Sequence, residues 1–289
     1  MNVKSLLPKF IYWKKATWTR SQWFCYDYMK LFLKYKDNNE YSAKRTYKSE
    51  LKDVIWIYWR QGEENAPAIV QKCINSVRRN AGNRQVIVLN EKTMADYLVM
   101  PDFIEKKHQN GKIKEALYSD LLRISLLLEY GGIWCDATCY MTEKIYPIIE
   151  EASFFMFNKS LLYINTIPSE CSSWFIIANK NNLILQKVRN VLFHYYKKHS
   201  WTPDYYIFHI VHGLLVHTDK NIKELWESKP FICNMNPHVF QFSFSEPYNE
   251  KMYRHILSSC FIHKLTYKFD TKLLNVKQEN MLQHFLRNN

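Results

Sequence analysis

Three charged side chains and one hydroxyl in the middle of the sequence have types and spacings that suit catalysis. Asp120 and Arg123 interrupt an apolar run with helical spacing and stand three residues apart, so they share one face of the expected helix. Asp136 follows a short apolar run at the place where a strand would end, and Thr138 comes two residues later. A carboxylate in that position can bind a divalent cation directly or through water, with help from the hydroxyl.

The same charges can also hold an organic ligand. Asp120 can accept hydrogen bonds from ligand hydroxyls, and Arg123 can donate in fixed geometry to hydroxyl or phosphate oxygens. Trp56 and Tyr58, near the end of another expected strand, offer flat faces on which a base can stack. A nucleotide sugar has a base, phosphates and a polyol. The competing interpretation, which these residues leave open, is a buried Asp–Arg pair that only ties the helix to the sheet.

The elements around these residues alternate between strand and helix. Gly131 and Gly132 end the central helix, because glycine adopts the left-handed conformation that a helix terminus often needs. The alternation predicts an α/β fold with a mostly parallel sheet covered on both faces. Ligands of such sheets bind beyond the carboxyl ends of the strands, so we expect residues 59–62 and 136–138 to border one crevice. The expected strands are residues 54–59, 85–89 and 133–135, and the expected helices are residues 67–80, 91–99 and 114–130.

The second half of the chain carries a weaker pattern. Residues 153–158 and 174–178 read as strands, and residues 183–198 read as a helix. An apolar segment over residues 205–217 contains His209, His212 and His217 at spacings that fit one helix face. No carboxylate or cysteine is interleaved with them, so the pattern favours core or surface histidines over a metal site.

The N-terminal region, residues 1–52, is basic and aromatic, and residues 21–35 have the spacing of an amphipathic helix. Such a helix can lie in a membrane interface, with its rings at headgroup depth and its lysines on anionic lipid. It can equally pack on the main domain with its lysines in water. The spacing alone leaves both interpretations open.

The totals exclude several classes of protein. The chain has 289 residues, only 6 glycines and 47% hydrophobic residues, so it is neither disordered nor fibrous. No apolar run is long enough to span a bilayer, no signal-peptide pattern opens the chain, and the 7 cysteines form no C-x-x-C frame. We therefore expect a cytoplasmic location. The net charge of +13 favours anionic partners without choosing among nucleic acid, acidic lipid and phosphorylated substrates.

The motif region resembles a known family. The string ALYSDLLRISLLLEYGGIWCDATCYMTEKI (residues 116–145) is similar to the capsular polysaccharide synthesis glycosyltransferases, relatives of the enzymes with a D-x-D sugar-binding region. Those relatives include yeast-type mannosyltransferases and the large glucosylating toxins. VIWIYWRQGEENAPAIVQKCINSVRRN resembles the family's first strand and helix, and FIHKLTYK resembles its closing motif. The likeness covers roughly residues 54–268 and is dense only in these three blocks.

The resemblance implies a GT-A fold, with a Rossmann-like sheet and additional helices at the N-terminus and in the C-terminal half. It implies one glycosyltransferase domain over residues 53–289, with a donor-binding half at about 53–147 and an acceptor-side half at about 148–289. It also implies transfer of a hexose, galactose or glucose, from a UDP-sugar with retention of configuration. Trp56 would stack on the base, Asp120 and Arg123 would hold sugar hydroxyls, and Asp136 would contact ribose, sugar and metal. Further donor contacts are expected from Tyr58, Gln61, Gly62, Thr138 and Lys264.

One departure from the family pattern concerns the metal. Thr138 stands where the D-x-D relatives have a second aspartate, and a neutral hydroxyl is a much weaker ligand for a hard cation. We therefore expect Mn²⁺ or Mg²⁺ to bind weakly to Asp136 and Thr138, with help from His263, or to be partly replaced by Arg or Lys. The charge of the leaving diphosphate would fall to the metal, Arg123 or the late lysines Lys264 and Lys268. The best candidate for a nucleophilic carboxylate on the acceptor side is Asp204.

The acceptor implied by the resemblance is a lipid-linked oligosaccharide repeat unit at the inner face of the cell membrane. A peripheral membrane location would give the basic, aromatic N-terminus a physical use. Two other classes compete with this interpretation. A nucleic-acid-binding protein is suggested by the charge and aromatic residues, but no known nucleic-acid motif occurs, so we expect no nucleic-acid partner. A non-catalytic membrane adaptor would not need Asp120, Arg123 and Asp136 to converge.

Overall fold

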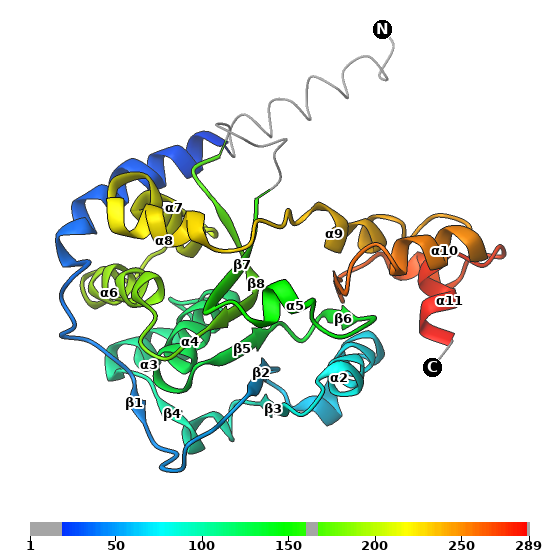
Figure 1. The fold of residues 1–289 in the computed structure, drawn as a ribbon, viewed down its shortest axis with the longest axis horizontal. Helices are drawn as coiled ribbons and strands as arrows, with labels where there is room; N and C mark the ends of the chain where they lie inside the picture. Colours follow the sequence, from blue (N-terminus) through cyan, green and yellow to red (C-terminus); the bar gives the residue numbers. More distant parts are fainter. Residues whose placement is uncertain (1–18, 160–166, 288–289) are drawn as a thin grey trace, which may run out of the picture.

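The computed structural model describes residues 19–159 and 167–287, and the structural statements below concern those residues. A five-stranded sheet with the order β3–β2–β5–β8–β7 forms its centre (Figure 1). Strand β2 is therefore an interior strand, which explains why all five of its residues are buried. The strands are β2 (Val54–Tyr58), β3 (Gln85–Leu89), β5 (Gly132–Cys135), β7 (Phe154–Asn158) and β8 (Cys171–Ala178).

The sheet is parallel in one half and antiparallel in the other. Strand β2 pairs in parallel with β3 and with β5, so Trp56 lies beside both Ile87 and Trp134. Strand β8 runs against both β5 and β7. The expected α/β fold is confirmed, and its sheet is mixed because β8 is reversed. The parallel half brings the carboxyl ends of β2 and β5 to one edge, as the strand–helix alternation predicts.

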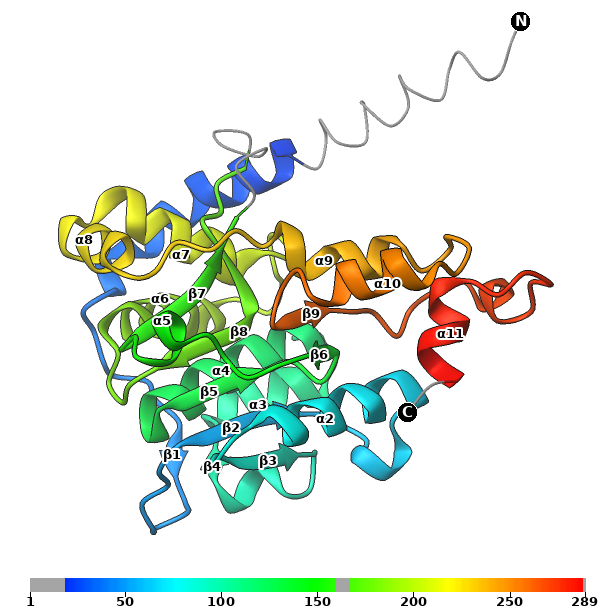
Figure 2. The same ribbon diagram turned by 45° about the vertical axis from the view of Figure 1, so that its right-hand side comes forward.

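Helices cover both faces of the sheet (Figures 1 and 2). One core cluster joins the sheet to α3 (Asp102–Gln109), α4 (Glu115–Tyr130), α6 (Leu183–Lys198), α7 (Ile207–Thr218) and α8 (Lys220–Ser228). The other joins it to α2 (Ala68–Asn80), α5 (Pro147–Glu150), α9 (Met235–Phe242), α10 (Glu250–Leu257) and α11 (Met281–Arg287). Two small sheets pair β1 (Lys44–Arg45) with β4 (Leu98–Val99) and β6 (Cys139–Met141) with β9 (Ile262–Lys264).

The turn between α4 and β5 depends on its two glycines. Gly131 has φ +71° and its N–H donates to Leu127 O, which ends the helix. Gly132 has φ +96°, and a Cβ added there would lie 2.5 Å from the carbonyl oxygen of Val54. Only glycine fits this approach of β5 to β2. The pair thus fixes where α4 ends relative to the strand that carries Asp136.

The N-terminal segment packs on the helical layer. Residues 19–29 form a helix that continues into a 3₁₀ turn, η2 (Lys30–Tyr35). Cys25, Met29 and Phe32 are buried in the core cluster, while Phe24 and Leu31 are each 64% exposed. Of the two interpretations of this segment, packing on the main domain therefore holds for residues 19–35. Membrane contact stays a prediction, and residues 1–18 lie outside the described residues.

One expected helix is wrong, and other expectations are confirmed. Residues 91–99 form a 3₁₀ turn, η4 (Met94–Asp96), followed by β4. The side chain of Asn90 accepts hydrogen bonds from the backbone N–H groups of Lys92 and Thr93, so a local turn replaces the first helical turn. The strands expected at 153–158 and 174–178 and the helix at 183–198 occur as β7, β8 and α6.

Within the described residues, no helix is both long enough and apolar enough to cross a bilayer.

Candidate active site

A cleft of about 770 Å³ opens at the edge where β2 and β5 end. Both halves of the chain contribute to its wall. Residues 59–62 and 136–138 were expected there, and Trp59, Gln61, Asp136 and Thr138 do line the cleft. Its further walls come from α4 (Glu115, Ser119, Asp120, Arg123), β8 (Cys171, Ser172, Ser173, Trp174), the start of α7 (Tyr205, Tyr206, His209), α9 (Met235, His238, Phe242) and the segment after β9 (Tyr267, Lys268).

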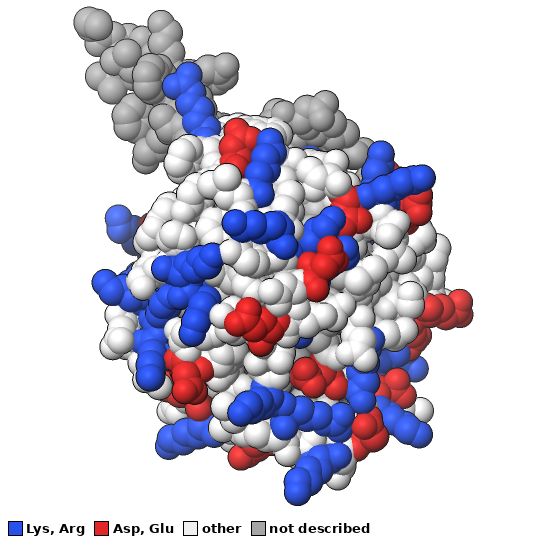
Figure 3. All heavy atoms as spheres, turned by 90° about the vertical axis from the view of Figure 1, so that its left-hand side faces the viewer, with Lys and Arg blue, Asp and Glu red and all other residues white. Residues whose placement is uncertain are grey.

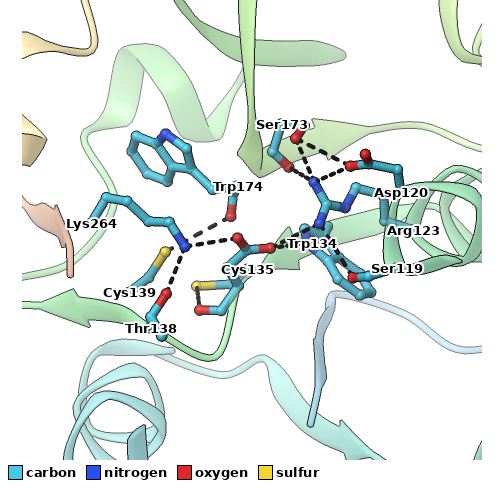
Figure 4. A network of polar contacts seen from close by, with 11 residues as sticks. Ser119, Asp120, Arg123, Trp134, Cys135, Thr138, Cys139, Ser173, Trp174 and Lys264 are labelled. Carbon is cyan, nitrogen blue, oxygen red and sulfur yellow. Dashed lines mark hydrogen bonds and ion pairs between the residues drawn. The ribbon is translucent and has the colours of Figure 1, made fainter. Parts of the chain in front are cut away.

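The three charges singled out by the sequence meet at the floor of this cleft (Figure 4). Arg123 lies between two carboxylates, with Nη1 2.9 Å from Asp120 Oδ1 and Nη2 3.1 Å from Asp136 Oδ1. Asp120 and Arg123 come from one face of α4, and Asp136 from the end of β5. The convergence that a nucleotide-sugar site requires is present, and the roles of the three residues stay predictions.

The two carboxyl groups differ in their electrostatic surroundings. Burial raises the pKa of Asp120 to about 6, although Arg123 opposes that shift. Burial would raise the pKa of Asp136 too, but Lys264 and Arg123 outweigh it and hold that pKa below its usual value. Asp136 is therefore a carboxylate near neutral pH, while the pKa of Asp120, at about 6, lies close to neutral pH.

Lys264 completes the network from the far end of the chain. Its Nζ lies 2.8 Å from Asp136 Oδ2 and donates over 2.6 Å to Thr138 Oγ1. Strand β9 places it there, because Lys264 pairs with Cys139 of β6 and the next residue, Leu265, donates its N–H to Thr138 O. Burial would lower the pKa of Lys264, but Asp136 raises it above the usual value, so the ammonium stays charged. The cleft network, as we name it, consists of Asp120, Arg123, Asp136 and Lys264.

Sequence reasoning missed several side chains that hold this network. Ser173 of β8 accepts from Arg123 Nη1 through both its carbonyl oxygen, at 2.8 Å, and its hydroxyl, at 2.5 Å. Trp134 donates its indole N–H to Asp136 Oδ1 at 2.8 Å, and the Arg123 guanidinium lies over its ring. Trp134 carried a usable signal, because residues two apart on a strand share one side. Ser173 carried none, since it lies 50 residues from Arg123.

Trp56 does not reach the cleft, so its expected stacking on a base is wrong for this structure. It is fully buried, its indole N–H donates to Gly131 O, and its ring packs against Tyr97 and Tyr130. The reason is that Trp56 sits mid-strand under α4, whereas the edge of the sheet begins at Tyr58. Tyr58 and Trp59 do line the cleft, and the Trp59 ring meets Tyr267 edge to face at 5.1 Å.

Three further residues that were expected in the site lie outside the cleft. Gly62 is not among the cleft-lining residues, and its φ of +87° marks the turn after β2. His263 is wrong as a metal ligand, because neighbouring residues of a strand face opposite sides and it points into the core, 3.1 Å from Leu257 O. Asp204 is wrong as an acceptor-side carboxylate: it does not line the cleft, and it accepts hydrogen bonds from Ser21 Oγ and from the backbone N–H of Tyr206.

The donor set near Asp136 does not fit a divalent cation. One carboxylate oxygen accepts from Arg123 and Trp134, and the other binds Lys264. The hydroxyl of Thr138 also accepts from Lys264, so neither expected ligand presents a free oxygen of high charge. Across residues 19–159 and 167–287, no group of three or more His, Cys, Asp or Glu side chains is placed to hold a metal.

The three histidines of α7 do not form a cluster. His212 is fully buried beside Trp226, whereas His217 contacts Tyr26 and Glu170. His209 lines the cleft, where burial, with Arg123, lowers its pKa to about 3. His209 is therefore a neutral imidazole beside the network, able to donate to or accept from a ligand hydroxyl.

Three comparisons relate this chain to known proteins. O-glycosyltransferase braB of Annulohypoxylon truncatum is 30% identical over 103 residues, which cover 32% of this chain and 24% of that protein, so the match spans only about a quarter of that relative. The solved structure of the PaToxG glycosyltransferase aligns over 95% of this chain and 96% of its own, with 13% identity and a TM-score of 0.40. The sequence profile described as capsular polysaccharide synthesis protein matches residues 11–285. As the central motif string indicates, the chain belongs to the capsular polysaccharide synthesis protein family.

Proposed function

We propose that this protein is a glycosyltransferase that moves a hexose from a UDP-sugar to a saccharide acceptor in capsular polysaccharide synthesis, with retention of configuration. The observation that carries the proposal is the cleft network at the carboxyl ends of β2 and β5. Family membership and the name of the O-glycosyltransferase relative support it. Charged side chains that gather beside an open cleft, with a pKa shifted by burial as that of Asp120 is, are candidates for a functional site.

The polar floor of the cleft suits the sugar and the diphosphate. Asp120 accepts hydrogen bonds from sugar hydroxyls. Arg123 is fixed between two carboxylates and Ser173, and it orients the sugar. Asp136 contributes a permanent negative charge next to Lys264. For the base, the aromatic pair Trp59 and Tyr267 at the cleft wall replaces the buried Trp56 as a flat face.

The transfer step is a substitution at C1 of the sugar and changes no oxidation state. The bond between C1 of the sugar and the β-phosphate oxygen breaks, and its electron pair stays on that oxygen. The acceptor hydroxyl oxygen forms the new bond to C1, and its proton passes to the departing diphosphate. The developing charges are an oxocarbenium-like sugar and a more negative diphosphate, and fixed charges in a buried site stabilise both.

A panel of nucleotide sugars tests the proposal. Purified protein is incubated with the uridine, guanosine and adenosine diphosphate hexoses, and release of free nucleotide is measured with and without added saccharide acceptors. We expect release from one UDP-hexose and a rise in melting temperature with UDP, because a ligand that binds only the folded state stabilises it. Absence of release and of thermal stabilisation across the whole panel would refute the proposal.

The acceptor is proposed to be lipid-linked and the protein to act at the inner membrane face. Residues 1–18 contain Lys4, Lys9, Lys14 and Lys15 among aromatic side chains, a composition that favours anionic lipid. The experiment removes residues 1–18 only, because residues 19–35 pack in the core and Gln22 lines the cleft. We expect the truncated protein to lose binding to phosphatidylglycerol vesicles while nucleotide release is kept. Equal vesicle binding by both proteins would count against this location.

The face of the molecule shown in Figure 3 gives no specific support to a nucleic-acid partner. On the face shown in Figure 3, Lys and Arg side chains are interspersed with Asp and Glu. Some of the basic side chains are locally paired, as Arg45 and Lys180 are with Glu50. A continuous basic stripe, which phosphate-backbone binding favours, is not what this face presents.

A further inference from the structure

We propose that the ammonium group of Lys264 is the resident cation of the Asp136–Thr138 motif and does the work of a divalent metal ion, so that sugar transfer proceeds without added metal. The inference rests on the proposed function, because it concerns the charge of the departing diphosphate. Of the two expectations for this motif, it selects replacement of the metal by a lysine over weak binding of Mn²⁺ or Mg²⁺ to Asp136 and Thr138. The contacts in Figure 4 carry it.

The position of the ammonium is the first observation. Lys264 Nζ bridges the first and third side chains of the motif, at 2.8 Å from Asp136 Oδ2 and 2.6 Å from Thr138 Oγ1. A cation held by both of these side chains would occupy this same point. The backbone pairing of β9 with β6 fixes the lysine there, so its placement does not depend on a flexible loop.

The charge balance of the cleft network is the second observation. Two carboxylates, Asp120 and Asp136, face two cations, Arg123 and Lys264, so the network is neutral before a donor enters. A divalent ion at Asp136 would have to displace Lys264 or sit beside it, and like charges at such distances repel strongly in a buried site. The negative diphosphate of a donor would instead meet cations that are already in place.

The sequence departure at Thr138 fits the same explanation. Where a metal is held, a second carboxylate supplies charge and a hard oxygen ligand. Where an ammonium is held, one carboxylate balances its charge and a hydroxyl needs only to accept a hydrogen bond, as Thr138 does. The hydroxyl of Thr138 therefore suits the ammonium group of Lys264, although the two residues are 126 positions apart in the sequence.

The first test measures nucleotide release by the wild-type protein with EDTA and with Mn²⁺. We expect the two rates to agree within about twofold, because the charged lysine supplies the electrostatic stabilisation. Lys264→Met removes the ammonium group and keeps an unbranched side chain as long as the aliphatic part of lysine, and we expect release to fall by about a hundredfold or more. Lys229→Met is the matched control, because Lys229 is also a buried lysine but lies outside the cleft. Loss of release in EDTA that Mn²⁺ restores would overturn the inference.

The second test measures Mn²⁺ binding by electron paramagnetic resonance and needs no turnover. We expect no bound Mn²⁺ in the wild type and stoichiometric binding in the double variant Thr138→Asp/Lys264→Ala, which restores two carboxylates and removes the ammonium. Binding to the wild type that Asp136→Asn abolishes would overturn the inference. A wild type that ignores Mn²⁺ but releases nucleotide from no donor would refute the proposed function and leave Lys264 as the cation of this motif.

Discussion

Two ion networks in this protein each join two aspartates to two cationic side chains, and they have different surroundings. The cleft network joins Asp120 and Asp136 to Arg123 and Lys264. A second group, here called the helix-cap network, joins Asp37 and Asp219 to Lys36 and Lys187, with N···O distances of 2.7 to 3.0 Å. It ties the end of the N-terminal segment to α6 and to the start of α8.

The difference lies in what each network leaves open. Asp219 also accepts from the backbone N–H groups of Asn221 and Ile222, so its oxygens complete the N-terminus of α8. None of the four helix-cap side chains lines the cleft, whereas all four of the cleft network do. Buried ion pairs therefore do not mark a functional site by themselves. The adjoining cavity distinguishes the network that we propose to bind a ligand from the one that holds helices together.

Asp136→Asn gives the largest expected effect on the activity. The amide keeps the size of the side chain but removes the charge that balances Lys264 and Arg123. We expect nucleotide release per folded molecule to fall by about 10²- to 10³-fold, the usual cost of one electrostatic contact in a transition state. The measurement is kcat/KM for the donor, with the fold checked by circular dichroism. A variant as active as the wild type would show that the cleft network does not support the activity.

Asp219→Asn is the matched substitution in the helix-cap network. Asparagine is also a good N-cap, so this change removes the charge and keeps the capping oxygen. Although burial opposes it, Lys36 and Lys187 hold the pKa of Asp219 below its usual value, so the charged form stabilises the fold above about pH 4. We expect the free energy of unfolding at neutral pH to drop by about 1–3 kcal/mol in urea titrations. Activity per folded molecule should not change, and a large loss there would contradict the division of roles.

The acid side of the pH profile tests Asp120. Because burial raises its pKa to about 6, donor kcat/KM should fall as the pH drops through that value, where Asp120 gains a proton and its charge no longer orients Arg123. Between its ordinary value near 4 and about 6 the folded state holds more protons than the unfolded chain, so the contribution of Asp120 to stability is full below this window and is lost as pH rises through it. Asp120→Asn should remove both dependences. An unchanged acid limb in the variant would assign that limb to another group.

Phe242→Ala should give the smallest effect. Phe242 lines the outer cleft and is 70% exposed, so it contributes an apolar face without supporting the core. We expect the KM for a saccharide acceptor to rise about three- to tenfold from lost ring contact, with donor hydrolysis unchanged. The comparison measures both rates on the same preparation. An equal loss of donor hydrolysis would place Phe242 on the donor side.

Local patterns in the sequence were enough to find most of the elements and three members of the cleft network, Asp120, Arg123 and Asp136. The three-residue spacing of Asp120 and Arg123 put both on one face of α4, and the glycine pair ended that helix where β5 begins. The apolar blocks predicted β2, β3, β7 and β8, because buried strands need apolar side chains on both faces. These features rest on periods of 3.6 and 2 residues, which the sequence carries directly.

The tertiary structure alone decided which face of each element meets the cleft and how Lys264, which only the family resemblance had named, joins the network there. His263, as a helper in metal binding, and Lys264, as a donor contact, were both expected in the site, yet Lys264 reaches Asp136 and the adjacent His263 points into the core. Likewise α4 covers Trp56, while Trp59, just beyond the strand, faces the opening. The reason is physical: alternation fixes that neighbours point apart, but only long-range packing determines which side is covered.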